Sequence, residues 1–99
     1  MLDIEKTLDN GALLIELKGK LDTTTAPELE DAIKESIEGI TDLTLDFEEL
    51  TYISSAGLRV LLSAQKIMNN QGSMKVKNVC QEISEIFEVT GFSDILTIE

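Results

Sequence analysis

Residues 52–62, Tyr-Ile-Ser-Ser-Ala-Gly-Leu-Arg-Val-Leu-Leu, combine two adjacent hydroxyl groups with small side chains at the expected start of a helix. Free backbone N–H groups and the positive end of the helix dipole favour an anion at such a position. A phosphate on Ser55 would therefore be tolerated there without unfolding the domain. The same residues also suit a simpler role, because Ser54 or Ser55 can be the N-cap of the helix. The residue types alone leave a phosphorylation site and a helix cap both open.

Nucleophilic and metal chemistry find little support in this chain. It contains no histidine, which excludes Ser-His-Asp and Cys-His catalysis, histidine-dependent metal sites and phosphohistidine relays within it. The two serines lie in Ile53-Ser-Ser-Ala-Gly57 and not in a G-x-S-x-G motif. The sequence also lacks a glycine-rich phosphate loop and a cluster of metal ligands. We therefore expect a protein that is not an enzyme and that uses no cofactor and no metal.

The composition is that of one acidic domain. The 99 residues suit a single domain over residues 1–99, and 42% hydrophobic residues supply a core. A net charge of -11 argues against nucleic acid and anionic membranes as partners, and it suits a basic partner surface or simply solubility. Cys80 is the single cysteine, and neither a signal peptide nor a membrane-spanning apolar stretch is apparent. We expect a cytoplasmic protein, and nothing in the sequence demands more than a monomer.

Hydrophobic periodicity predicts an α/β domain with a mixed, mostly parallel sheet. Asn10-Gly11 favours a tight hairpin between the first two strands, and Gly91 marks the end of the last helix. Thr25-Ala-Pro-Glu28 matches a capping box, so the first helix should begin near Thr25. The expected order is strand, strand, helix, strand, helix, strand, helix, strand, over residues 2–8, 12–18, 25–38, 42–47, 56–71, 74–77, 81–90 and 95–98.

The serine pair is expected in a loop over residues 48–55. This loop should lie outside the carboxyl ends of the parallel strands, where open α/β sheets usually place their sites. Arg59 follows Ser55 by four residues, one helical turn, so the two side chains can face each other. One hypothesis is that Arg59 pairs with a phosphate on Ser55, and the alternative is that it is a solvated surface arginine.

Three segments resemble the STAS domain family, in particular its anti-sigma factor antagonists. Leu50–Leu62 is similar to a signature that usually reads Asp-Ser-Ser/Thr-Gly-Leu, with Ser54 at the aspartate and Ser55 at the phosphorylated serine. Gly19-Lys-Leu-Asp-Thr-Thr-Thr-Ala26 resembles the G-x-L-D-x-x-T-A segment of the family. Residues 78–79 and 89–92 resemble its closing N-V-x…L-T-G-L stretch. The likeness covers essentially the whole chain without insertions.

The resemblance implies a STAS fold and a protein-binding switch. The unphosphorylated protein would bind an anti-sigma factor that is a GHKL-type serine kinase, and this binding would free the sigma factor. The kinase would then phosphorylate Ser55 and dissociate, and a PP2C-type phosphatase would restore the serine. Ser54 replaces the usual aspartate, which makes it a second candidate acceptor, and Asp22 would supply a nearby carboxylate. The implied partner surface consists of Asp22, Thr24, Ser54, Ser55, Ala56, Gly57, Leu58 and Arg59.

The sequence leaves other functions open. A STAS protein could instead be a fixed adaptor in a transport or signalling assembly, without a phospho-switch. Asp46, at the end of a predicted strand, would suit a receiver domain phosphorylated on aspartate. However, the chain lacks an acidic pair after its first strand and begins with a hairpin, both of which disfavour a receiver.

Overall fold

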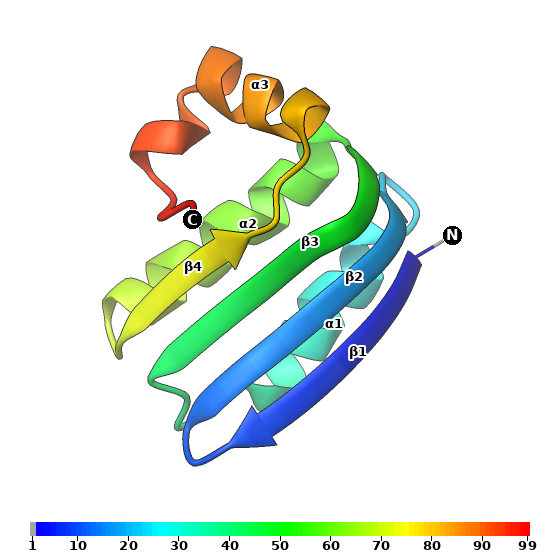
Figure 1. The fold of residues 1–99 in the computed structure, drawn as a ribbon. Helices are drawn as coiled ribbons and strands as arrows, with labels where there is room; N and C mark the ends of the chain where they lie inside the picture. Colours follow the sequence, from blue (N-terminus) through cyan, green and yellow to red (C-terminus); the bar gives the residue numbers. More distant parts are fainter. Residues whose placement is uncertain (1) are drawn as a thin grey trace.

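The computed structural model describes residues 2–99 and has the α/β architecture that the sequence predicts. Four strands form one sheet in the order β1-β2-β3-β4, in which β1 and β2 are antiparallel and the other neighbours are parallel (Figure 1). The elements are β1 (Leu2–Asp9), β2 (Ala12–Leu21), α1 (Ala26–Ser36), β3 (Asp42–Ile53), α2 (Ser55–Asn69), β4 (Ser73–Lys77), α3 (Gln81–Thr90) and the 3-10 helix η1 (Phe92–Asp94).

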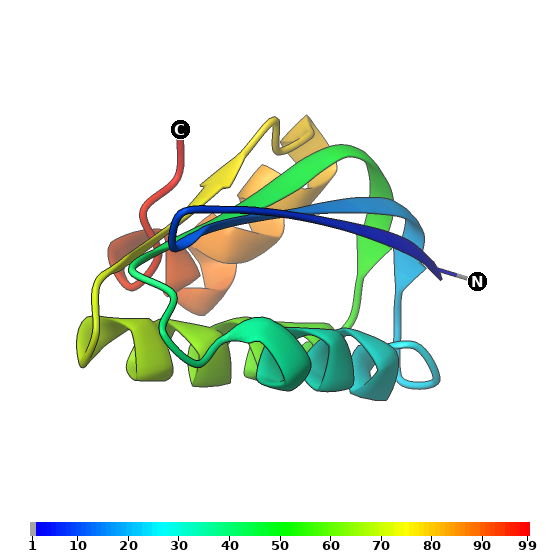
Figure 2. The ribbon, with the colours of Figure 1, turned by 90° about the horizontal axis from the view of Figure 1, so that it is seen from below.

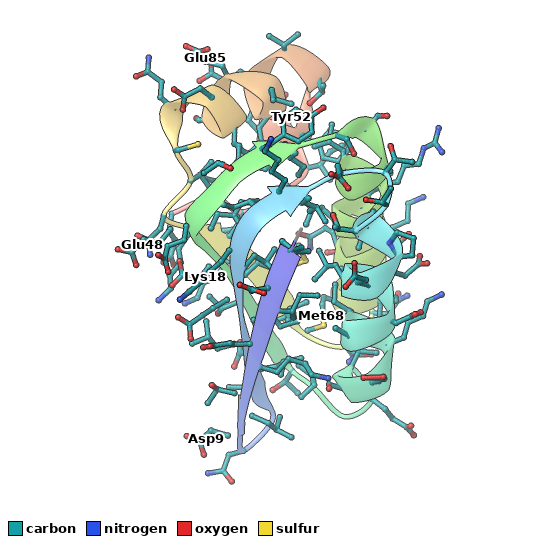
Figure 3. The ribbon with its side chains drawn as sticks, turned by 90° about the vertical axis from the view of Figure 1, so that its right-hand side faces the viewer. Asp9, Lys18, Glu48, Tyr52, Met68 and Glu85 are labelled. Atoms are coloured by element: carbon teal, nitrogen blue, oxygen red, sulfur yellow. The ribbon has the colours of Figure 1, made fainter. Side chains whose placement is uncertain are left out.

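The sheet and two helices form two layers with the hydrophobic core between them. Helices α1 and α2 lie side by side below one face of the sheet (Figure 2). Met68 of α2 points into the space between the layers, whereas Lys18 and Glu48 lie on the opposite side of the sheet (Figure 3). The largest fully buried side chains are aliphatic or phenylalanine: Phe47, Phe87, Leu13, Ile15, Leu17, Leu21, Leu29, Leu43, Leu45, Leu50, Leu61 and Met68.

The predicted hairpin is confirmed. Asp9 pairs with Ala12, which leaves Asn10 and Gly11 as a two-residue connection. Their φ angles are 47° and 83°, as in a type I′ turn, which matches the right-handed twist of the flanking strands.

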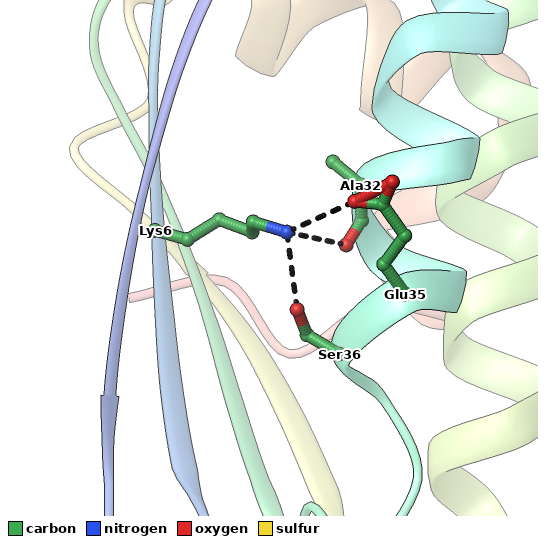
Figure 4. Close-up of polar contacts among 4 residues, drawn as sticks. All are labelled: Lys6, Ala32, Glu35 and Ser36. Carbon is green, nitrogen blue, oxygen red and sulfur yellow. Dashed lines mark hydrogen bonds and ion pairs between the residues drawn. The ribbon is translucent and has the colours of Figure 1, made fainter.

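A lysine holds the edge strand β1 against the helix layer (Figure 4). The Nζ atom of Lys6 donates to the Ala32 carbonyl at 3.4 Å, to Glu35 Oε2 at 3.3 Å and to Ser36 Oγ at 3.1 Å. These acceptors lie in the last turns of α1, where a cation complements the helix dipole. The contact fixes the carboxyl end of α1 relative to the sheet.

Two expectations about strands are corrected. The predicted fifth strand over residues 95–98 is only a single bridge between Val76 and Ile98, because the chain is a 3-10 helix up to Asp94 and Ile95 still has helical backbone angles. The predicted loop over residues 48–55 is mostly strand, because β3 keeps pairing with β2 as far as Ile53.

The long strands β2 and β3 bend as they approach their carboxyl ends. The β2–β3 register shifts between Glu16 and Lys18 and again between Gly19 and Lys20. Such bulges increase local twist and bend a strand. The carboxyl ends of β2 and β3 accordingly curve toward the helix layer (Figure 2). This curvature carries the two following loops to the start of α2.

Candidate functional site

Two neighbouring parallel strands end together at the site. Leu21 of β2 pairs with Ile53 of β3, so Asp22 and Ser54 are the next residues of adjacent strands. The Ser54 N–H donates to the Leu21 carbonyl at 2.8 Å, which extends this pairing by one further bond. The two segments that the sequence singled out therefore meet at the carboxyl edge of the sheet, as predicted.

The two serines have different surroundings. Ser54 is the N-cap of α2: its φ and ψ are -100° and 175°, and its Oγ accepts a 3.4 Å hydrogen bond from the Gly57 N–H. Ser55 is the first residue of α2 and is exposed, and within residues 2–99 its hydroxyl has no hydrogen-bond partner. The cap role suggested by the sequence therefore belongs to Ser54, which leaves the Ser55 hydroxyl accessible.

Gly57 sets how closely α2 approaches the strand ends. A Cβ at this position would lie 2.7 Å from Leu21 Cγ and 2.9 Å from Ile53 Cγ1, both of which belong to buried side chains. Atoms this close overlap sterically, so any side chain would push the helix start away from β2 and β3. Glycine at this position therefore keeps Ser55 close to the loop that follows β2.

The Asp22 loop is organised by its own carboxylate. Asp22 Oδ1 accepts from Thr24 Oγ1 at 2.8 Å and from the N–H groups of Thr24 and Thr25 at 3.0 Å each. The Thr24 hydroxyl, followed by the Thr25 amide, holds the pKa of the Asp22 carboxyl below its usual value of 3.8, because these donors stabilise the charged form. Asp22 is thus a preorganised anion at the edge of the site.

The predicted capping box at the start of α1 is wrong. Thr25 is the N-cap residue, but its side chain makes no cap hydrogen bond. Its Oγ1 instead donates to the Lys20 carbonyl at 2.9 Å and accepts from the Asp22 N–H at 2.8 Å. The buried hydroxyl therefore closes the Asp22 loop, and Glu28 is left exposed.

A groove between α1 and α2 is lined by Ala56, the residue that follows Ser55. It has a volume of about 340 Å³ and is lined by Thr23, Pro27, Glu30, Ala56, Arg59 and Val60, among others. Its walls are mainly apolar, and Arg59 and Glu30 are the charged residues that line it. Sequence reasoning missed Thr23 and Pro27, because nothing local indicates that the first turn of α1 faces that of α2.

The predicted partner surface divides into exposed and buried members. Thr24, Ser55 and Arg59 are exposed, and Asp22, Ser54 and Ala56 are partly exposed. Gly57 and Leu58 are buried, and Leu58 is 8% exposed within the core cluster. The structure therefore gives Gly57 and Leu58 packing roles, and their contact with a partner remains a prediction.

Asp46 lies elsewhere and is already engaged. Its side chain is 8% exposed, and its Oδ1 accepts from the Glu48 N–H and from Asn78 Nδ2, both at 3.0 Å. Asn78 has a positive φ of 58°, so this carboxylate stabilises an unusual backbone turn after β4. A structural role accounts for Asp46.

Residues 2–99 contain no group of three or more histidine, cysteine, aspartate or glutamate residues arranged to hold a metal ion. Over the same residues, no helix combines the length and the hydropathy needed to cross a membrane.

A family model described as STAS domain matches residues 3–99. The chain belongs to the STAS domain family. This STAS domain is 29% identical over 99 residues to an anti-sigma-B factor antagonist of Staphylococcus aureus (strain NCTC 8325 / PS 47), with 98% of this chain and 92% of the relative covered. It is 26% identical over 98 residues to the anti-sigma-B factor antagonist of Bacillus subtilis (strain 168), with 98% and 90% covered.

Solved STAS structures share the fold. The unphosphorylated form of the anti-sigma factor antagonist SpoIIAA superposes with a TM-score of 0.77 at 19% identity and covers 100% of this chain and 87% of that one. The phosphorylated form of SpoIIAA from Bacillus gives 0.76 at 19% identity, with 100% and 91% covered. These comparisons confirm the α/β STAS fold, including the order of the elements from β1 to α3.

Proposed function

We propose that this STAS domain is an anti-sigma factor antagonist whose partner binding is switched off by phosphorylation of Ser55. In this proposal the unphosphorylated protein binds a GHKL-type anti-sigma kinase in the cytoplasm and frees the sigma factor. Transfer of the ATP γ-phosphate to the Ser55 hydroxyl then releases the kinase, and a PP2C-type phosphatase hydrolyses the phosphoester. The antagonist names of the two bacterial relatives support the choice of partner.

The observation that carries the proposal is the difference between the two serine hydroxyls. Ser54 Oγ is used as a helix cap, whereas Ser55 is exposed at the first position of α2. The small side chain of Ala56 beside it leaves room for the active site of a kinase. The first helical turn also stabilises negative charge, by about 0.3 to 1 kcal/mol. Ser55 therefore combines access with tolerance of a phosphate.

Releasing the partner requires only a small loss of binding free energy. A phosphate adds about -1.5 to -2 charge at pH 7. A partner surface that is complementary to a neutral serine would then have to desolvate a dianion. A hundredfold loss of affinity corresponds to about 2.7 kcal/mol, and like charge or an unpaired charge at an interface can cost that much. The domain itself need not change shape.

The test is a phosphorylation and release assay. The protein is incubated with ATP and the GHKL kinases of its own genome, and the phosphate is mapped by mass spectrometry. We expect modification of Ser55 in the wild type and in Ser54→Ala, none in Ser55→Ala, and release of bound kinase on modification. The Ser54→Ala control is expected to cost about 1 kcal/mol of stability through loss of the cap. Phosphate on Ser54 would contradict the assignment, and stable binding without any phosphate would favour a fixed adaptor.

A further inference from the structure

Arg59 is placed to interact with a phosphate on Ser55. It is the only arginine of the chain, and it lies exposed on α2, four residues after Ser55. We propose that Arg59 is the intramolecular counter-ion of phosphorylated Ser55, with its guanidinium donating to the phosphate oxygens. This inference rests on the proposed phosphorylation of Ser55 and adds a residue that would stabilise the phosphorylated state.

The helix geometry brings the two side chains together. Four residues of α-helix advance by about 6 Å and return almost to the same face. Side chains on a helix lean toward its amino terminus, so an arginine four residues after Ser55 can reach back over the turn that carries it. The order also suits the pair, because an acidic group four residues before a basic one is the more favourable arrangement. Arginine further offers a planar fork of donors that matches a phosphate.

The guanidinium is not committed to another residue. Four lysines form ion pairs within residues 2–99, namely Lys6, Lys18, Lys34 and Lys75, whereas Arg59 forms none there. Glu30 of α1 lines the same groove, but its Oε2 lies 3.9 Å from Lys34 Nζ. Pairing with a phosphate would therefore not require Arg59 to break an existing ion pair.

Pairing of Arg59 with the phosphate would change the partner surface in a second way, in addition to the new negative charge. Before phosphorylation, the surface beside the groove presents a neutral serine and a free cation. After phosphorylation it presents a dianion and a guanidinium that is already engaged. A partner acid that pairs with Arg59 in the complex would lose its counter-ion at the same step. The ratio of partner affinities between the two states should therefore depend on Arg59.

The direct test uses phosphoserine installed at position 55 by genetic code expansion, so it does not depend on any kinase. Because the chain has one arginine, its Nε–Hε group gives a single arginine signal in a ¹H–¹⁵N spectrum. We expect this signal to shift on phosphorylation and to follow the ³¹P titration of the phosphate, whose second pKa is about 6 in model compounds. Arg59→Ala should raise that phosphate pKa by about 0.3 to 0.5, and 1 M salt should reduce the difference.

Matched variants separate pairing from general charge. Lys66→Ala removes an exposed cation from the last turn of the same helix and should leave the phosphate pKa unchanged. Arg59→Lys keeps the charge but loses the fork, and should give an intermediate value. An unshifted arginine signal together with equal phosphate pKa values in wild type and Arg59→Ala would overturn the inference. A kinase assay without Ser55 phosphate would instead overturn the proposed function and leave this result standing.

Discussion

Replacing Gly57 with alanine should destabilise this domain, although a change from glycine to alanine at an exposed helix position usually stabilises a protein. Alanine is favoured over glycine in a helix interior by about 1 kcal/mol. Here, however, the new Cβ would lie 2.7 Å from Leu21 Cγ and 2.9 Å from Ile53 Cγ1. Leu21 is 0% exposed and Ile53 is 3% exposed, so neither side chain can move aside into solvent. Overpacking of this kind costs about 1 to 3 kcal/mol.

The expected net loss is up to about 2 kcal/mol in the free energy of unfolding, measured by urea denaturation. For a domain of this size, a loss of about 2 kcal/mol lowers Tm by about 8 to 16 °C. A double-mutant cycle with Leu21→Ala provides the control, because that change removes the nearest atom, Leu21 Cγ, and leaves Ile53 Cγ1 in place. In that background Gly57→Ala should cost about 1 kcal/mol less. A stabilising Gly57→Ala in the wild-type background would refute the argument that glycine is needed for close helix–strand packing.

Two further predictions concern the ends of other elements. Gly72→Ala should destabilise the domain by about 3 kcal/mol or more, because the new Cβ would overlap the backbone carbonyl of Thr41, which cannot move aside as a side chain can. Equal urea midpoints for the variant and the wild type would contradict this prediction. The pKa of Asp22, followed by carboxyl ¹³C NMR, should lie below 3.8, and Thr24→Val should raise it by removing the Thr24 hydroxyl that lowers it most. Because folding lowers the pKa of Asp22, its ionised carboxylate stabilises the folded domain fully at neutral pH, and this stabilisation is lost as pH falls below about 4. An unchanged Asp22 pKa in Thr24→Val would show that the Thr24 hydroxyl does not cause the lowering.

Local signals in the sequence were sufficient wherever the structure depends on neighbouring residues. Asn10-Gly11 predicts the hairpin because both residues tolerate positive φ. The helix over residues 81–90 was predicted with its observed bounds, and Gly91 ends it with a left-handed φ of 83°. In each case the decisive interactions lie within a few residues along the chain.

The tertiary structure decided features that depend on distant segments. Residues 95–98 would have to pair along the edge of β4 to form a strand, and only the Val76–Ile98 bridge forms. Likewise, residues 48–53 were expected in a loop but continue β3, because they pair with β2 as far as Ile53.

The serine pair shows the same division. Its sequence identifies two hydroxyls at a helix start but does not determine which one is free. The parallel pairing of Leu21 with Ile53 positions Ser54 so that its N–H bonds to β2 and its Oγ caps α2. Ser55 is left exposed one residue later, with Arg59 one turn beyond it. Residue types therefore determined which chemistry was available, and strand pairing decided which serine remains accessible, because backbone hydrogen bonds between distant strands fix the entry into the helix.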